Sequence, residues 1–404
     1  MTDAVSSRIY RVVSARSLNT FGRSIINATV LWELYERTHS KLVLAGVGAI
    51  QMVPVIALFV PAGAIVDRVD RRLLTTLAAA LTGAVGLGLA LASAFGAPVA
   101  VYYLLLLALG GIAVIHAPAS GSLVPMIIER GHLERANRIG ATAQELCAIT
   151  GPALAGLALT VVVPAGIYSF VAVTGVSSAI LYRTLPKPRA VVTSPNARKD
   201  WRVGLRFIFR SPLLLPALTL DMFAVLFAGV IALLPAIATD ILHTDALGYG
   251  ILRASQSTGA VLMAIIGGRL PAWKRPGRVL LIVVALFGVA TSLIGVSTSL
   301  PLTVALLVIC GALDNISVVI RLTLEQLVVP DEIRGRVSSV HYVFIGMSNE
   351  LGAAESGLAA WLVGTVPAIV GGGAVAVVVV GVVALVWKDL ARMPPLSELK
   401  PPEP

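Results

Sequence analysis

The chain has 404 residues, of which 57% are hydrophobic and only 13% are charged, and its mean hydropathy is +0.90. Soluble domains carry about a quarter charged residues, so this composition excludes a soluble enzyme or soluble binding module. The formal net charge of +10 is compatible with nucleic-acid binding, but the placement of the basic residues argues against it.

Long apolar runs define the predicted elements in chain order. A transmembrane helix needs about 20 mostly apolar residues, and several runs of that length are almost free of charge. The sequence therefore predicts an all-α membrane protein with about twelve transmembrane helices. The predicted spans are 14–36, 42–66, 73–95, 99–127, 137–163, 165–185, 213–241, 247–270, 277–297, 301–328, 336–363 and 365–387.

The basic residues gather in every second gap between these spans. The other set of gaps holds only Arg37 and Lys41. Because cytoplasmic loops are enriched in Lys and Arg, we expect both termini to be cytoplasmic and no nucleic-acid partner. The polar N-terminal residues lack the apolar core of a cleavable signal peptide, so we expect the first span to direct insertion. The basic gaps hold Arg130, Arg135, Arg138, the stretch from Arg183 to Arg210, Arg269, Lys274, Arg275, Arg278, Arg334 and Arg336, besides the arginines after the second span.

The widest basic gap divides the chain into two halves. It is rich in Pro, Lys and Arg and ends in a segment whose arginines recur every four residues, at Arg202, Arg206 and Arg210. That spacing predicts a short amphipathic helix on the cytoplasmic leaflet, with a solvated linker as the alternative. The predicted organisation is a six-helix bundle over 1–185, a linker over 186–212, a second six-helix bundle over 213–388 and a cytoplasmic tail over 389–404.

A polar connection follows the second span and reads GAIVDRVDRRLL. A glycine there permits close helix approach, and an aspartate can cap a helix N-terminus or pair with a neighbouring arginine. The pattern resembles the signature loop of the major facilitator superfamily. The resemblance implies a cytoplasmic latch made by Gly63, Asp67, Arg68, Arg71 and Arg72. The equivalent segment of the second half, 267–278, has no aspartate, so the latch is expected on one side only.

The fifth predicted span contains CAITGPALAG. Its proline kinks the helix, and its glycines allow tight packing against a neighbour. The segment resembles the antiporter motif of drug-exporting facilitators at Gly151, Pro152 and Gly156, whereas Cys147 and Ala155 depart from it. Further patches, such as HAPASGSLVP and GLRFIFRSPLLLPAL, resemble the branch that contains enterobactin exporters and macrolide efflux proteins. The resemblance implies export of an amphipathic, moderately large molecule.

Ionisable residues inside the predicted spans are candidates for function because their burial in a bilayer is costly. A carboxylate there can take up a proton on one side and release it on the other, and the alternative is an ion pair with a buried arginine. For Arg321 and Glu325, four residues apart, we expect a structural intrahelical pair. The proton-coupling candidates are Asp314, Glu350, Asp221 and Glu145, the possible charge partners are Arg23 and Arg253, and the possible cavity residues are His116, Gln144, Asn315 and Asn349.

The predicted function is proton-coupled export of a small molecule by alternating access. The sequence contains no phosphate-binding GxxxxGK[ST] loop and no Cys/His cluster, so we expect no cofactor, no metal and no enzymatic activity. The predicted setting is a bacterial inner membrane, with the lipid bilayer as surroundings and a monomer as the working unit. The alternatives are a uniporter or symporter for a nutrient or metal, and a lysolipid transporter on the same fold.

Overall fold

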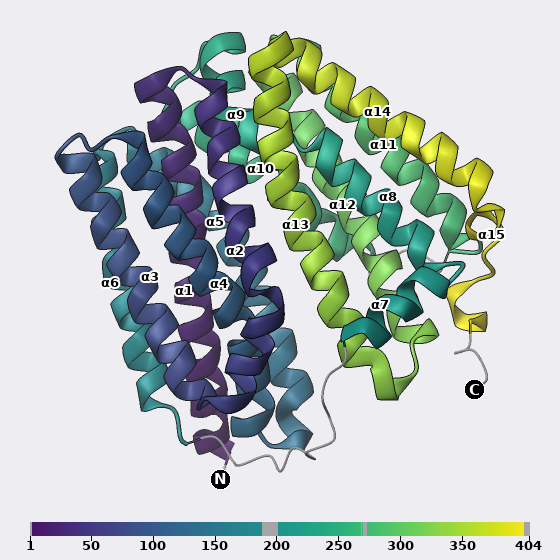
Figure 1. Ribbon diagram of the computed structural model, residues 1–404, viewed down its shortest axis with the longest axis horizontal. Coiled ribbons are helices and arrows are strands. Elements are labelled where there is room, and N and C mark those ends of the chain that lie inside the picture. The colour runs from purple at the N-terminus through teal and green to yellow at the C-terminus, as the bar shows by residue number, and fades with distance from the viewer. Residues whose placement is uncertain (1, 188–200, 268, 270–272, 400–404) are drawn as a thin grey trace. The chain divides into compact units, whose positions relative to one another are not determined.

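The computed structural model describes residues 2–187, 201–267, 269 and 273–399, and all the regular secondary structure among them is helical (Figure 1). The N-terminal half contains α1 (Thr2–Thr38), α2 (Lys41–Arg68), α3 (Arg71–Ala94), α4 (Val99–Ile127), η1 (Arg130–His132), α5 (Leu133–Leu159) and α6 (Pro164–Thr184). The remainder contains α7 (Trp201–Arg210), α8 (Leu214–Ala228), η2 (Val230–Leu233), α9 (Leu234–Ala236), η3 (Ile237–Ile241), α10 (Ala246–Gly267), α11 (Pro276–Val296), α12 (Leu300–Val328), α13 (Asp331–Val363), α14 (Thr365–Val386), α15 (Lys388–Ala391) and η4 (Leu396–Glu398).

Packing divides the chain into two compact units. Unit 1 consists of Met1–His39, Ala49–Thr193 and His243–Ala254, and unit 2 consists of Ser40–Gly48, Ser194–Leu242 and Ser255–Pro404. Residues 188–200 of the linker predicted between the halves lie outside the described residues.

Eight helical segments in the described part of the chain are long and apolar enough to cross a membrane. They are α2, α3, α4, α6, the segment from α8 to η3, α11, α12 and α14. The long helices α1, α5, α10 and α13 fall outside this set. They carry more polar and charged residues, among them Arg23, Gln144, Arg253 and Glu350. These more polar helices hold many of the candidate site residues, which is the reason their apolar signal is weaker.

Glycine contacts repeat in the two units. In unit 1, α3 and α6 pack so closely that a Cβ on Gly175 would collide with the backbone of Gly83. In unit 2, a Cβ on Gly373 of α14 would collide with the backbone of Gly288 of α11. Both glycines of unit 2 follow their counterparts by about 200 residues, as expected for a parallel repeat of six helices. Figure 1 shows α3 beside α6 and α11 beside α14.

The segment that follows α8 departs from regular helix. Gly229 has a non-helical backbone, and a 3-10 turn and a π-helical turn lie between it and Leu242. Irregular backbone inside a bilayer needs partners for its polar groups, and side chains of unit 2 supply them. The Thr291 hydroxyl donates to the Ala228 carbonyl at 3.4 Å, and the Ser356 hydroxyl donates to the Gly229 carbonyl at 3.2 Å.

The amphipathic segment predicted from arginine spacing forms the helix α7, with its three arginines exposed. Gly204 on its other face lies against the backbone of Arg336 at the start of α13, where a Cβ would come within 2.7 Å of the Arg336 carbonyl carbon. The helix therefore packs on unit 2 through a small residue, and its exposed arginines lie where solvent or lipid headgroups can surround them.

The connection between α2 and α3 is shorter than the sequence pattern suggested, because α2 continues to Arg68 and α3 begins at Arg71. Asp70 caps α3 by accepting a hydrogen bond from the backbone N–H of Arg72 at 2.8 Å. Capping, one of the two roles considered for Asp67, is thus carried out by Asp70. The guanidinium of Arg72 donates to the carbonyl of Arg183 at the end of α6.

Candidate functional site

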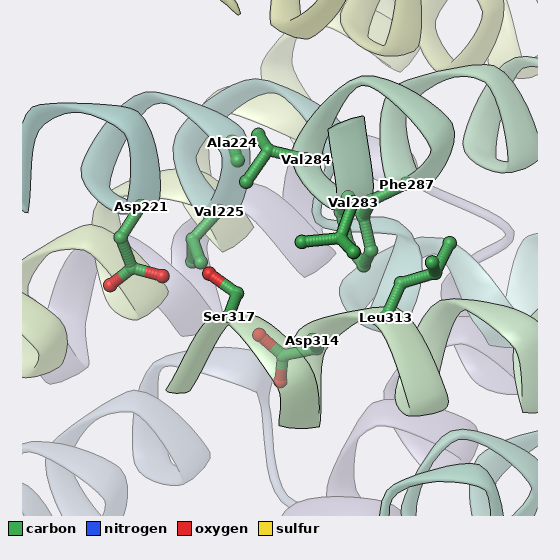
Figure 2. Close-up of a pocket in the computed structure, with 9 residues that line it drawn as sticks. All are labelled: Asp221, Ala224, Val225, Val283, Val284, Phe287, Leu313, Asp314 and Ser317. Carbon is green, nitrogen blue, oxygen red and sulfur yellow. The ribbon is translucent and has the colours of Figure 1, made fainter. Parts of the chain in front are cut away.

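Two of the four proton-coupling candidates line the same cavity in unit 2. Asp221 of α8 and Asp314 of α12 border it together with Ser317 and apolar side chains of α8, α11 and α12 (Figure 2). The cavity volume is about 20 Å³, which is enough for a single water molecule. Two carboxylates and a hydroxyl around a water-sized space form an arrangement that can receive and pass on a proton.

Arg321 holds one of these carboxylates in place. Its side chain is 3% exposed and forms an ion pair with Asp221. Its Nε also donates to the carbonyl and the hydroxyl of Ser317, each at 3.3 Å. Asp314, Ser317 and Arg321 follow at three- and four-residue spacing on α12, so they share one helix face. A polar ladder therefore runs along α12 and faces Asp221.

The intrahelical pair predicted between Arg321 and Glu325 is wrong. Glu325 instead accepts hydrogen bonds from Ser338 and contacts the ring of His341, both on α13. Arg321 and Glu325 do lie four residues apart on α12. The side chain of Arg321 is buried against α8, however, and that of Glu325 is buried against α13. Tertiary packing therefore supplies closer partners than the local spacing does.

A larger polar pocket lies in unit 1 with a volume of about 270 Å³. It contains two of the four cavity candidates, His116 of α4 and Gln144 of α5, and the predicted charge partner Arg23 of α1. The ring of His116 is buried, and its two nitrogens contact Asn19 Nδ2 at 3.3 Å and the Tyr182 hydroxyl at 3.2 Å. The described residues that line the pocket are Arg16, Thr20, Arg23, Ser24, Asn27, His116, Ala117, Ser120 and Gln144.

Comparison with known families identifies the fold and its class of activity. The family model described as Major Facilitator Superfamily matches residues 12–353. The chain belongs to the major facilitator superfamily. It is therefore a multi-pass secondary transporter of small molecules and not an enzyme. The predicted all-α facilitator fold is confirmed.

Individual relatives of this facilitator are distant. The enterobactin exporter EntS of Escherichia coli O1:K1 is 27% identical over 300 residues, which cover 73% of this chain and 71% of that protein. A bacterial homologue of the human lysosomal transporter Spinster superposes with a TM-score of 0.74 at 16% identity, covering 99% of both chains. A POT family transporter in complex with a thioalcohol-conjugated peptide has a TM-score of 0.70 at 13% identity, covering 95% of this chain and 96% of that one.

The motif of the fifth span makes close helix contacts in this facilitator. A Cβ on Gly151 would lie 2.8 Å from Cβ of Ser24 on α1, and a Cβ on Gly156 would collide with Gly250 of α10. Pro152 lies inside α5, as expected for a kinked span. Both glycines are therefore required by the packing within unit 1.

Among the described candidates, Glu350, Asn315, Asn349 and Arg253 do not line either cavity. Glu350 is half-buried on α13, Asn315 is half-buried on α12, and Asn349 is exposed. The Nε atom of Arg253 on α10 is buried without a hydrogen-bond partner among the described residues. The side chains of Glu145 and Asp67 and the surroundings of Gly63 lie outside the described part of the structure.

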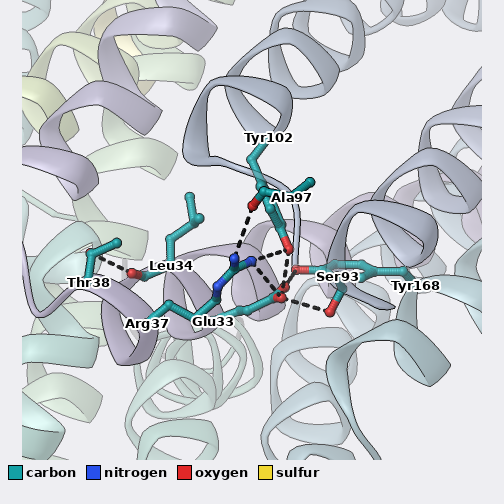
Figure 3. A network of polar contacts seen from close by, with 8 residues as sticks. All are labelled: Glu33, Leu34, Arg37, Thr38, Ser93, Ala97, Tyr102 and Tyr168. Atoms are coloured by element: carbon teal, nitrogen blue, oxygen red, sulfur yellow. Dashed lines mark hydrogen bonds and ion pairs between the residues drawn. The ribbon is translucent and has the colours of Figure 1, made fainter. Parts of the chain in front are cut away.

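A buried acid in unit 1 was missed by the sequence reading. Glu33 of α1 is 5% exposed and accepts hydrogen bonds from Ser93 and Tyr102, each at 2.7 Å, and from Tyr168 at 2.8 Å (Figure 3). Arg37 lies 3.7 Å from the same carboxylate and donates to the Tyr102 hydroxyl at 2.8 Å. One carboxylate thus joins α1 to α3, α4 and α6.

This cluster predicts a large effect on stability. Because a buried hydroxyl left without a partner costs about 1–3 kcal/mol, Glu33→Ala should lower the free energy of unfolding by about 3 kcal/mol or more. Glu33→Gln retains one acceptor and should cost roughly half as much. Thermal and denaturant unfolding in detergent measure both changes. The matched control is Glu36→Ala, an exposed acid on the same helix. A Glu33→Ala protein as stable as the control would contradict the assignment.

Proposed function

We propose that this facilitator couples the inward flow of protons to the export of an amphipathic small molecule. The observation that carries the proposal is the pair Asp221 and Asp314, which come from two helices and line one water-sized cavity beside a buried arginine. Ionisable groups inside a transporter mark ion and substrate pathways. Two acids that share a cavity are suited to proton transfer in a way that a single acid sealed in an ion pair is not.

The roles of the two acids differ in this proposal. Arg321 balances the charge of Asp221 and holds its carboxylate against α12. Asp314 is the group that takes up and releases the proton, because it lies on the face of α12 that carries Ser317 and Arg321 and reaches the same cavity. A proton on Asp314 changes the charge balance around Arg321, and that change would favour one conformation over the other.

Export, and not import, is supported by two observations. The chain is distantly related to proteins named enterobactin exporters, and α5 carries the glycine and proline spacing of an antiporter motif in a region of close helix contacts. We therefore propose a siderophore-like or antibiotic-like substrate. The remaining parts of the proposal are alternating access of bundles 1–185 and 213–388, a latch at Asp67 with its arginines, a bacterial inner membrane with both termini cytoplasmic, and a working monomer.

Uptake into everted membrane vesicles tests coupling and direction together. The vesicles are acidified inside and offered a catecholate siderophore, a macrolide or a lipophilic cation, before and after an uncoupler. Accumulation of one compound that the uncoupler abolishes is the expected result. Transport that ignores the uncoupler would overturn proton coupling and favour facilitated or lysolipid movement. Accumulation only in right-side-out vesicles would reverse the direction and favour a symporter.

A further inference from the structure

The polar pocket of unit 1 is built around a stripe of side chains on α1. Arg16, Thr20, Arg23 and Asn27 recur at four-, three- and four-residue spacing and all line the pocket. At 3.6 residues per turn, Arg16 and Arg23 stand almost two full turns apart on one face. Arg16 and Arg23 therefore both direct their guanidinium groups to the same cavity.

The opposite walls contribute hydrogen-bonding groups without adding charge. With its amide oxygen directed at Arg16, Gln144 of α5 accepts hydrogen bonds from Nε and, at 3.0 Å, from Nη2. Nδ1 of His116 faces the amide nitrogen of Asn19, which makes Nδ1 an acceptor and leaves the proton of a neutral ring on Nε2, facing Tyr182. Ser120 completes the α4 wall.

The described lining of the pocket thus carries two guanidiniums and no carboxylate. Its volume of about 270 Å³ is close to the lower end of the range for small-molecule sites, about 300–1,000 Å³. A cavity of this size can hold the charged group of a small molecule together with part of the rest of that molecule. Guanidiniums bind planar and tetrahedral oxyanions through paired hydrogen bonds.

We propose that this pocket binds the oxyanion of the transported molecule, so that the substrate class of the exporter is amphipathic organic anions. Arg16 and Arg23 hold the anionic group, and Gln144 orients Arg16. Asn27 adds to the same wall a buried amide oxygen that has no hydrogen-bond partner among the described residues, which can accept from a hydroxyl next to the anion. This inference rests on the proposed transport function and identifies the chemistry that its substrate must have.

Equilibrium dialysis of the purified transporter in phosphatidylcholine nanodiscs tests the pocket directly. The probe is dansyl-phenylalanine, and its uncharged amide is the matched control ligand. Wild type should bind the carboxylate at least about tenfold more tightly than the amide. Since a hydrogen bond to a charged group contributes about 1.5–3 kcal/mol, Arg16→Gln and Arg23→Gln should each weaken carboxylate binding by about tenfold or more. Neither should change the affinity for the amide.

Arg11→Gln is the control variant, because Arg11 is an exposed arginine on the same helix that does not line the pocket. It should bind both probes as wild type does. Equal wild-type affinity for carboxylate and amide would overturn the proposal. So would arginine variants that stay folded, as judged by their thermal unfolding, and weaken both probes to the same degree.

An anionic lipid headgroup could present the same chemistry as a soluble anion. Repeating the titration in nanodiscs that contain phosphatidylglycerol separates the two sources: competition for the probe assigns the pocket to a headgroup, and unchanged affinity assigns it to a soluble organic anion. Binding is measured without a proton gradient, so the two proposals fail separately. Proton-driven uptake without carboxylate preference overturns only the anion pocket, whereas carboxylate preference without uptake overturns only the transport mechanism.

Discussion

Arg321→Leu is expected to lower the free energy of unfolding by about 3–5 kcal/mol, since removal of one partner leaves a buried charge without compensation. Arg321 is 3% exposed, and the side chain of its partner Asp221 is 10% exposed. The substitution also removes the donor to Ser317. Denaturant unfolding in detergent micelles, followed by circular dichroism, measures the change.

The double variant Asp221→Asn with Arg321→Leu provides the internal control. Replacing both members of a buried pair by uncharged groups is often close to neutral, so the double variant should recover most of the stability that Arg321→Leu loses. If the double variant is as unstable as the single one, the ion pair is not the cause of the loss. A single variant as stable as wild type would show that the pair contributes nothing.

The membrane fold could be predicted from the sequence because its signal is local. A run of apolar residues long enough to cross a bilayer is visible without knowledge of its neighbours, and the glycine-rich α14 is an example. The helices α1, α5, α10 and α13 were weaker cases, since they carry the polar residues of the candidate sites. They were predicted as spans from apolar runs that these polar residues interrupt, and the alternation of basic residues in the gaps between the predicted spans agrees with that prediction.

The candidate site was predictable only in part, because side-chain partners are chosen by tertiary packing. Asp221 and Asp314 could be named as buried acids, but 93 residues of sequence separate them and nothing local indicates that they share a cavity. Arg321 illustrates the converse. Its spacing to Glu325 suits a helical pair, yet α8 and α13 present other groups to each of them.

The sequence does contain a local pattern that indicates an ion pair at Glu33. Glu33 lies inside the predicted first span, and Arg37 follows at four-residue spacing, so an ion pair within the span could have been inferred. Its three hydroxyl partners come from α3, α4 and α6. No sequence pattern connects Ser93, Tyr102 and Tyr168 to that carboxylate, and their convergence follows only from the packing of the four helices.

Asp314→Asn should abolish accumulation against a gradient while leaving the transporter able to exchange substrate. One proton that moves through about 100 mV supplies about 2.3 kcal/mol, which corresponds to an accumulation ratio of about 50-fold. Asparagine keeps the size and hydrogen-bonding groups of the side chain but cannot carry the proton. At steady state, everted vesicles with the variant should therefore reach an inside-to-outside ratio of about one.

Counterflow of labelled substrate into vesicles preloaded with unlabelled substrate, in the absence of a proton gradient, distinguishes loss of coupling from loss of the protein. The variant should retain counterflow at a rate within about twofold of wild type, since the pocket in unit 1 is untouched and equilibrium exchange requires no net proton movement. Asp389→Asn makes the same chemical change at an exposed acid of unit 2 and should accumulate substrate as wild type does. Full accumulation by Asp314→Asn would show that another acid carries the coupling proton. Asp221→Asn would then be the next variant, because Asp221 lines the same cavity.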